Sequence, residues 1–309
     1  MSKLKVLLVY IVYPLAMGTY FRSALEHRED VDLRVAGIYT GSWIPWKGGM
    51  SLPIKYAKPP DYVLPLSLGS NEYNYEMIMA QIGDWKPDLV IQVDAGFHAK
   101  YKPSQGVVVT VGTDPHVLND FYDVPRQYSD FFFNMQNVYS KPKDIYLPYA
   151  YSKYDFYPED VEPSEMVDAV MIGMPYEQRV QWVDILRSKG VKVIFENGPI
   201  LEDARHLYAC GKIGLNWSSL DDLNCRAFEL PAMKLAPVMN RVTDISKFFK
   251  EGTDFMGFSS LGEAVEQVLY LVENPEFRLN MAEQAYQRVL SGHHTYDDRI
   301  DQILKVVGS

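Results

Sequence analysis

The chain has 309 residues, of which 47% are hydrophobic and 23% are charged, and its formal net charge is -10. These values exclude a disordered chain, and the length fits two domains of about 150 residues each. Neither half carries an excess of basic residues, so the charge disfavours a nucleic-acid partner without excluding one.

Cysteine content and apolar runs bear on the compartment. Cys210 and Cys225 are the only cysteines, and they do not have the spacing of a zinc site or a disulfide framework. The apolar run at 6–15 lacks a small-residue cleavage site after it, which favours a buried strand over a signal peptide. Since no apolar run reaches the length of a membrane span, we expect a cytoplasmic protein.

The first half of the chain alternates short apolar runs with helical patterns. Apolar runs without polar alternation are typical of strands in a parallel sheet that is covered on both faces. The predicted strands are 6–12, 33–39, 89–93 and 107–111, and the predicted helices are 19–27 and 76–84. This pattern predicts a doubly wound, Rossmann-like α/β domain over residues 1–157.

The segment 41–74 is too long for a plain connection between two elements. It contains Trp43, Trp46, Tyr56 and Tyr62 among several prolines and glycines. These aromatic side chains either form a platform for a sugar or an acceptor, or fold back to cover the sheet. The sequence leaves both interpretations open.

The strand and helix pattern restarts after a segment rich in tyrosine and proline, 146–163, which we interpret as a hinge. The predicted strands are 169–172, 191–195, 213–217 and 236–239, and the predicted helices are 176–188, 226–233, 262–273, 274–291 and 296–307. We therefore expect a second Rossmann-like domain over 158–295, with helix 296–307 packing back on the first domain. Two such domains in series predict a cleft between them, where ligands bind beyond the carboxyl ends of the strands.

The densest group of polar residues lies at 216–229, where a strand end leads through a polar loop to a helix. Free backbone amides at a helix N-terminus favour an anion, and the Arg226 guanidinium offers a fork of donors that suits a diphosphate. Asn224, Arg226 and Glu229 can then face one ligand. If the helix begins near Asn224, Glu229 lies in its second turn and can accept hydrogen bonds from a ribose diol. The alternative is that the residues before Arg226 cap the helix, while Arg226 and Glu229 pair on a solvated face.

This loop carries a family resemblance. The segment Asp221-Asp222-Leu223-Asn224-Cys225-Arg226-Ala227-Phe228-Glu229 resembles the donor-site motif of the CgeB-like (spore maturation) glycosyltransferases, which reads Asp-Gly-Leu-Asn-x-Arg-x-Phe-Glu. Further segments that resemble the family are 146–150, 172–180, 274–278 and 293–299. Together they cover roughly residues 145–300, a combination more specific than any single motif.

The resemblance implies a GT-B fold and a hexosyltransferase-type glycosyltransferase that uses a nucleotide-diphosphate sugar, UDP- or GDP-linked, as donor, with no obligatory metal and no further cofactor. In the wider superfamily of retaining enzymes, two carboxylates eight positions apart hold the donor sugar and the ribose, and Asp221 and Glu229 have that spacing. The first position is Asp where the superfamily has Glu, and 233–235 reads Met-Lys-Leu where it has Ala-Cys-Gly. The resemblance therefore leaves retention or inversion open.

Three further residues are candidates for the donor site. Gly173 follows a predicted strand at a turn where the backbone can approach a phosphate, and Arg179 lies one turn into the next helix, in reach of a diphosphate. An ordinary turn and a surface arginine are the alternatives. Asn197 follows the next strand, where it either borders the pocket for the base or forms an ordinary turn.

In the first half, Asp114 and His116 follow the strand 107–111 and resemble an Asp-x-His segment of CgeB-like relatives. His116 is a candidate contact to the donor sugar or phosphate, and Asp114 is a candidate base toward an acceptor hydroxyl. The alternative is a turn in which Asp114 bonds to local amides. Asp94 and His98, after the strand 89–93, are further candidates.

Several other activities lack their motifs. The adjacent His293 and His294 have no acidic partner at ligand spacing, so we expect a packing role and no metal site. No Gly-x-Ser-x-Gly elbow, Walker loop or His-Glu-x-x-His motif occurs, which excludes the commonest hydrolases, NTPases and zinc proteases. A sugar-nucleotide epimerase of the same fold, or a non-catalytic sugar-nucleotide-binding or scaffolding protein, are the alternatives to a glycosyltransferase. The acceptor is not identified by the sequence.

Overall fold

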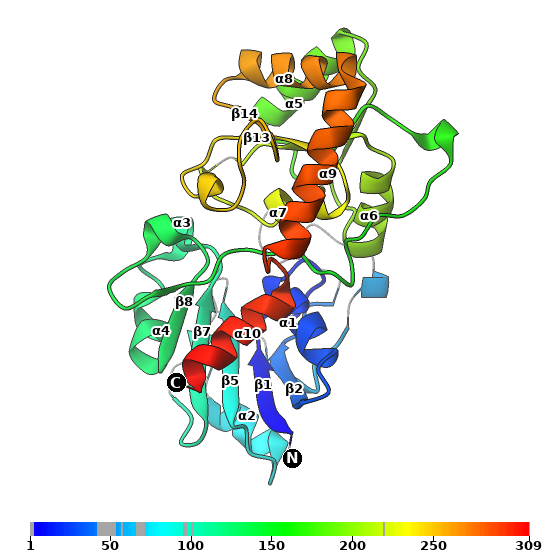
Figure 1. The fold of residues 1–309 in the computed structure, drawn as a ribbon. Coiled ribbons are helices and arrows are strands. Elements are labelled where there is room, and N and C mark those ends of the chain that lie inside the picture. Colours follow the sequence, from blue (N-terminus) through cyan, green and yellow to red (C-terminus); the bar gives the residue numbers. More distant parts are fainter. Residues whose placement is uncertain are drawn as a thin grey trace. The chain divides into compact units, whose positions relative to one another are not determined.

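The computed structural model describes residues 3–41, 54–56, 58–65, 72–73, 75–94, 98–99, 102–218 and 220–308. It divides into two units, Met1–Pro148 with Tyr296–Ser309, and Tyr149–Thr295. Each unit is built on a parallel β-sheet with helices packed against it (Figure 1). Among the described helices, none combines the length and the apolar character that crossing a membrane requires.

In its described part, the first unit alternates strands and helices along the chain. Its strands are β1 (Leu4–Val9), β2 (Val31–Ile38), β3 (Tyr62–Leu64), β4 (Glu72–Tyr73), β5 (Leu89–Asp94), β6 (His98–Ala99), β7 (Val107–Gly112), β8 (Phe131–Asn134) and β9 (Ile145–Tyr146). Its helices are α1 (Met17–Glu26), α2 (Tyr75–Ile82), α3 (Pro115–Leu118), α4 (Asp123–Tyr128) and α10 (Tyr296–Val307). The predicted elements of this half are all present with ends moved by a few residues. The elements that were not predicted are β3, β4, β6, β8, β9, α3 and α4.

The main sheet of this unit has the order β3-β2-β1-β5-β7-β8-β9 over the described strands, and its neighbouring strands pair in parallel. Leu8 of β1 lies opposite Val35 of β2 and Ile91 of β5. Successive residues of β1 point to opposite faces, and Leu7 and Leu8 are both fully buried. The apolar run of β1 is therefore explained by a sheet that is covered on both faces.

The chain reverses its direction of growth at β1. From β1 it adds β2 and β3 on one side, and it then returns to add β5 and β7 on the other side. Connections that leave in opposite directions leave a crevice at the carboxyl ends of the two central strands, and open α/β sheets bind ligands there. In this unit the crevice is expected beyond Val9 and Asp94.

The aromatic residues of segment 41–74 are described only in part. Trp43 and Trp46 lie outside the described residues. Tyr62 begins the edge strand β3 and packs against a core cluster that includes Leu64 and residues of α2. For Tyr62, packing against the sheet therefore fits, and a platform for a sugar or an acceptor does not.

The last helix, α10, belongs to the first unit. Tyr296 is 1% exposed, and its ring stacks on that of Tyr20 in α1 with the ring centroids 5.1 Å apart. The guanidinium of Arg299 donates to the carbonyl oxygen of Pro148 over 2.7 Å. Helices α1 and α10 therefore lie side by side on this unit (Figure 1).

The second unit repeats the architecture over its described residues. Its strands are β10 (Ala169–Ile172), β11 (Val193–Glu196), β12 (Ile213–Asn216), β13 (Ala236–Asn240) and β14 (Met256–Phe258). Its helices are α5 (Glu177–Ser188), α6 (Leu201–Ala209), α7 (Arg226–Ala232), α8 (Leu261–Glu273) and α9 (Pro275–Ser291). The strand order β11-β10-β12-β13-β14 reverses between β10 and β12. In this unit, α6 and β14 were not predicted.

The segment after Pro148 packs on the second unit. The Tyr151 amide donates to the His294 carbonyl oxygen over 3.0 Å, and the Phe156 ring lies 6.2 Å from that of Tyr208 in α6. These contacts place the division between the units at Pro148, earlier in the chain than the residue 157 expected from the sequence.

The stacking of α10 on α1 predicts a stability effect. Replacing Tyr296 with alanine removes a fully buried ring, and it should lower the free energy of unfolding of the first unit by about 3–5 kcal/mol. Lys305→Ala, at an exposed position of the same helix, is the matched control and should change stability by less than about 0.5 kcal/mol. Hydrogen exchange of the β1 amides at increasing urea concentrations measures the stability of the first unit in both variants. Equal effects of the two substitutions, or a loss confined to the second unit, would contradict the packing role of Tyr296.

Candidate functional site

Two guanidinium groups converge on Gly173, the residue that follows β10 at the reversal of the strand order. Gly173 has a φ of +147°. A Cβ atom at this position would lie 2.7 Å from Nη1 of Arg226 and 3.1 Å from Nη1 of Arg179. Only glycine therefore allows both the backbone conformation and the close approach of the two side chains.

Arg179, in the first turn of α5, is 3% exposed. Its Nε and Nη2 donate to the carbonyl oxygen of Trp217 over 2.9 and 2.6 Å, and its Nη1 donates to that of Met174 over 3.1 Å. Burial, together with the charge of Arg226, lowers the pKa of Arg179 to about 10. The group therefore stays protonated near neutral pH and keeps its donors on the main chain of two loops.

Arg226, at the start of α7, is half-buried. Its Nη1 donates to the carbonyl oxygen of Ile172 over 2.8 Å, which holds it beside the last residue of β10. Among the described residues, neither Arg226 nor Arg179 forms an ion pair with a carboxylate. Two adjacent positive charges without a paired acid favour an anion at this end of the sheet.

The start of α7 agrees with the predicted helix 226–233. Since the helix begins at Arg226 and not near Asn224, Glu229 lies in its first turn and not in its second. The amides of residues 227–229 donate to the carbonyl oxygens of Asn224 and Cys225 over 2.9–3.1 Å. The expected row of free amides for an anion is therefore wrong for these three, and the Arg226 side chain is left as the main donor.

Glu229 is 5% exposed and lies in a closed environment. Burial raises the pKa of Glu229 from 4.5 to about 7, while the charge of Arg226 and a hydrogen bond with the Cys225 thiol oppose the shift, and Asp155 adds to it. The fully buried Tyr208 interacts with the same group. The alternative of an Arg226–Glu229 pair on a solvated face is therefore wrong, because Glu229 points into the protein.

Amide side chains fix the loop between β12 and α7. Asn216 and Asn224 exchange two hydrogen bonds of 3.0 and 3.3 Å. Asn240 accepts from the Ser218 amide over 2.7 Å and donates to the Ser218 carbonyl oxygen over 3.1 Å. Asn224 therefore positions the loop. Asn216, Ser218 and Asn240 were not predicted, because they lie outside the motif 221–229. A polar residue at the carboxyl end of a buried strand, as at Asn216 and Asn240, is the signal that could have found two of them.

Two candidates stand at exposed positions. Asp221 has a φ of +53° and accepts from the Thr243 hydroxyl over 3.3 Å. Asn197 is exposed in the turn after β11, before Gly198 at a φ of +123°. The structure thus brings Gly173, Arg179, Arg226 and Glu229 together in space, and it places Asp221 and Asn197 on loops at the same end of the sheet.

In the first unit, Asp114 immediately precedes α3, and its carboxylate accepts from the Thr113 hydroxyl over 2.9 Å. The amides of Thr113 and Asp114 both donate to the hydroxyl of the buried Tyr122, over 3.2 and 3.1 Å. Tyr122, and not the Asp114 carboxylate, therefore satisfies these two amides of the turn.

The ring of His116 lies 6.3 Å from that of Tyr139, and its buried Nδ1 has no hydrogen-bond partner among the described residues. The side chains of Asp94 and His98 lie outside the described part.

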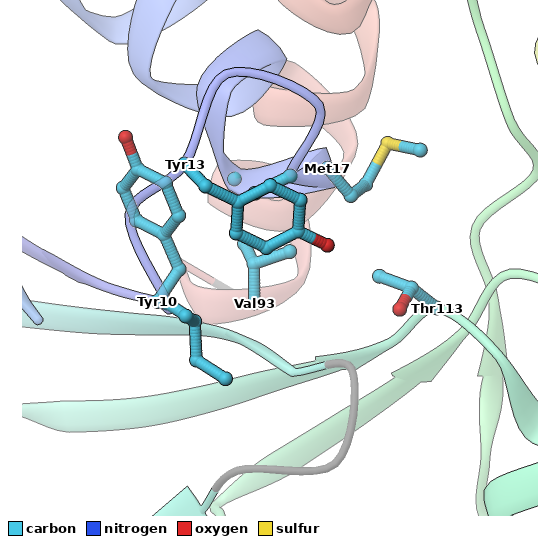
Figure 2. Close-up of a pocket in the computed structure, with 8 residues that line it drawn as sticks. Tyr10, Tyr13, Met17, Val93 and Thr113 are labelled. Atoms are coloured by element: carbon cyan, nitrogen blue, oxygen red, sulfur yellow. The ribbon is translucent and has the colours of Figure 1, made fainter. Parts of the chain in front are cut away.

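A pocket lies where the strand order of the first unit reverses (Figure 2). It is a shallow pocket open to solvent, and the space about its walls is about 250 Å³ when that open solvent is counted. Tyr10 and Tyr13 after β1, Met17 of α1, Val93 of β5 and Thr113 after β7 contribute to its wall. Figure 2 shows the hydroxyl of Tyr13 directed toward Thr113 and that of Tyr10 directed away from it.

Comparison with known proteins agrees with this architecture. Residues 166–305 match the family model Glyco_trans_1_2, described as "Glycosyl transferase-like". The chain is a glycosyltransferase of the GT-B fold. No curated protein sequence matches the chain.

Solved structures of this glycosyltransferase fold resemble the chain over nearly its whole length at low identity. Anabaena HepE, in complex with UDP and glucose, has a TM-score of 0.67 and 8% identity, with 99% of both chains covered. An α-glucosyltransferase in complex with UDP and a 13-mer DNA has a TM-score of 0.64 and 10% identity, with 100% of both chains covered. A putative UDP-N-acetylglucosamine 2-epimerase from Listeria monocytogenes has a TM-score of 0.60 and 12% identity, covering 99% of this chain and 96% of its own.

The pKa of Glu229 predicts how stability depends on pH. Because the folded-state pKa lies above the ordinary value, the unfolded chain releases this proton first, and stability falls as the pH rises from about 4.5 through 7. Glu229→Gln should remove this fall, so the stability of the variant relative to wild type should increase by roughly 3 kcal/mol between pH 4 and pH 8. Urea unfolding at both values measures the difference. The exposed Glu266→Gln is the control, and an identical pH profile in both variants would contradict the buried carboxyl.

Proposed function

We propose that the chain transfers a sugar from a nucleotide-diphosphate sugar, and that Arg226 binds the diphosphate. One observation carries the proposal: two guanidinium groups without paired carboxylates meet at Gly173, beyond the strands where the order of the sheet reverses. An anion that enters there would supply the missing negative charge. A diphosphate also suits the fork of an arginine better than a single carboxylate does.

The chemistry of sugar transfer requires such a group. When the bond between sugar and phosphate breaks, negative charge grows on the leaving nucleotide diphosphate, and a positioned guanidinium stabilises it. Gly173 has no side chain to obstruct the approach of a phosphate, and Arg226 is held at that position by the Ile172 carbonyl oxygen. The UDP bound in two structures of the same fold supports a nucleotide donor, and we propose a UDP- or GDP-sugar.

The other residues of the second unit receive roles through the resemblance to CgeB-like glycosyltransferases, a subfamily to which we propose that the chain belongs. Glu229 would hold the ribose and Asp221 the donor sugar, while Asn197 would border the base. Glu229 is the more demanding assignment, since its carboxyl lies in a closed environment and its pKa is about 7. A protonated Glu229 can donate one hydrogen bond to a ribose hydroxyl as well as accept one.

We propose that the acceptor binds in the first unit. Its pocket lies at the reversal of the strands and is lined by Tyr13 and Thr113, next to the Asp114 carboxylate. Asp114, bonded to Thr113, is the proposed base, and His116 the proposed contact to the donor. The net charge of -10 disfavours a long polyanion such as nucleic acid as acceptor.

A sugar-nucleotide epimerase is the second candidate, because the epimerase from Listeria monocytogenes has the same fold. Product analysis after incubation with UDP- and GDP-sugars separates the candidates. A transferase releases the nucleotide diphosphate and forms a new glycoside or free sugar, whereas an epimerase returns an altered nucleotide sugar. A non-catalytic binding or scaffolding protein would leave every nucleotide sugar unchanged.

The role of Arg226 predicts a large kinetic effect. Arg226→Ala should lower the rate of nucleotide diphosphate release from the best UDP- or GDP-sugar by about 10²–10³-fold, because a charge that stabilises the leaving group is lost. The exposed Arg187→Ala in α5 is the matched control and should keep the wild-type rate. Thermal unfolding checks that both variants fold. A folded Arg226→Ala enzyme with near wild-type turnover would remove Arg226 from the reaction.

Metal independence is a second prediction. Within the described residues, no group of three or more His, Cys, Asp or Glu side chains is placed to hold a metal ion. Because the proposed charge stabilisation comes from arginine, donor turnover should change by less than about twofold when EDTA is added and when MgCl₂ or MnCl₂ is restored. Abolition of turnover by EDTA, with rescue by one of these ions, would show that a metal takes part.

A further inference from the structure

The donors of Arg179 are directed at the main chain of two loops. Three hydrogen bonds join its guanidinium to the carbonyl oxygens of Met174, in the loop after β10, and Trp217, in the loop after β12. The Tyr176 ring lies over the guanidinium, with its centroid 4.9 Å from Cζ. Arg179 therefore connects the two loops that border the reversal of the sheet.

This arrangement keeps Arg179 from a ligand. The residue is 3% exposed, and to reach a phosphate its guanidinium would have to leave three hydrogen bonds and the covering ring of Tyr176. Breaking these charge-assisted hydrogen bonds would leave the Trp217 carbonyl oxygen without a partner among the described residues, and the Met174 carbonyl oxygen with the Tyr176 amide alone. Losing such hydrogen bonds is unfavourable inside a protein. The backbone of both loops would then lose the group that holds them together.

Arg226 is placed differently at the same point. It is half-buried, and within the described part of the chain one hydrogen bond, from Nη1 to the Ile172 carbonyl oxygen, holds its guanidinium. Its Nη1 lies 2.7 Å from where a Cβ of Gly173 would be, against 3.1 Å for the Nη1 of Arg179. The remaining donors of its fork are therefore the ones within reach of an anion beside Gly173.

We propose that Arg179 is a positioning residue, which holds the Gly173–Met174 turn against Trp217 and so places Arg226 for the diphosphate. The proposal rests on the proposed function of Arg226. Since Ile172, Gly173 and Met174 are consecutive, fixing Met174 also fixes the Ile172 carbonyl oxygen that holds Arg226. A lysine at 179 keeps the charge but cannot join two carbonyl groups through a planar fork.

A double-mutant cycle on pyrophosphate binding tests this inference. Calorimetry with pyrophosphate compares wild type, Arg179→Lys, Arg226→Lys and the double variant, with the exposed Arg187→Lys as control. We expect each single variant at the site to weaken binding about tenfold, and the double variant to be within about twofold of Arg226→Lys, because Arg179 acts through Arg226. Additive losses would make Arg179 an independent ligand, and unchanged affinity in Arg179→Lys would remove its role.

A measurement on the wild-type protein covers the case in which Arg179→Lys fails to fold. In protein labelled with ¹⁵N-arginine, pyrophosphate should shift the Nε–Hε resonance of Arg226 and leave that of Arg179 in place. An equal shift of the Arg179 resonance would overturn the proposal.

The two proposals can fail separately. If the wild-type protein binds neither pyrophosphate nor UDP nor GDP, the proposed function fails. The positioning role is still tested, because Arg179→Lys must shift the Arg226 Nε–Hε resonance of the ligand-free protein. An unchanged resonance there would overturn the positioning role alone.

Discussion

The second unit depends on the close approach of two like charges around a single backbone position. Arg179 and Arg226 both reach Gly173, and among the described residues neither forms an ion pair with a carboxylate. Backbone carbonyl oxygens from two loops hold the guanidinium groups in place, so main-chain dipoles take the part that a carboxylate has in an ordinary ion pair. The conformation of both loops is tied to this contact.

The direction of the strands explains why the contact forms at this point. In a parallel sheet the carboxyl ends of neighbouring strands lie at the same edge, and a reversal of strand order sends the two following loops apart. Gly173 follows β10 and Trp217 follows β12, the two strands on either side of the reversal. The first unit obeys the same rule, since its pocket is walled by residues after β1 and at the end of β5.

The sequence predicted the elements well where apolar periodicity is strong. Helix 296–307 has the predicted limits because its buried residues repeat at helical spacing. The apolar run at β1 indicates a strand even when the neighbouring strands are not known. Helix α6 was missed because a mostly polar stretch buries only Ala204 and Tyr208. Strand β14 was missed because three residues are too few to show a period.

The site could be predicted only as a set of residues. Arg226, Glu229 and Gly173 stand out by residue type and spacing, but the burial of Glu229 depends on how α7 packs against β12. At that interface, a Cβ on Gly214 would lie 2.8 Å from the side chain of Leu230, the residue after Glu229, so helix and strand approach each other closely there. A diphosphate that neutralised Arg226 would remove the charge that favours ionised Glu229, so it would raise the pKa of this carboxyl above about 7, and its binding would weaken as the pH rises through about 7 and above. The guanidinium proposed to bind the diphosphate and the carboxyl proposed for the ribose therefore form one coupled system.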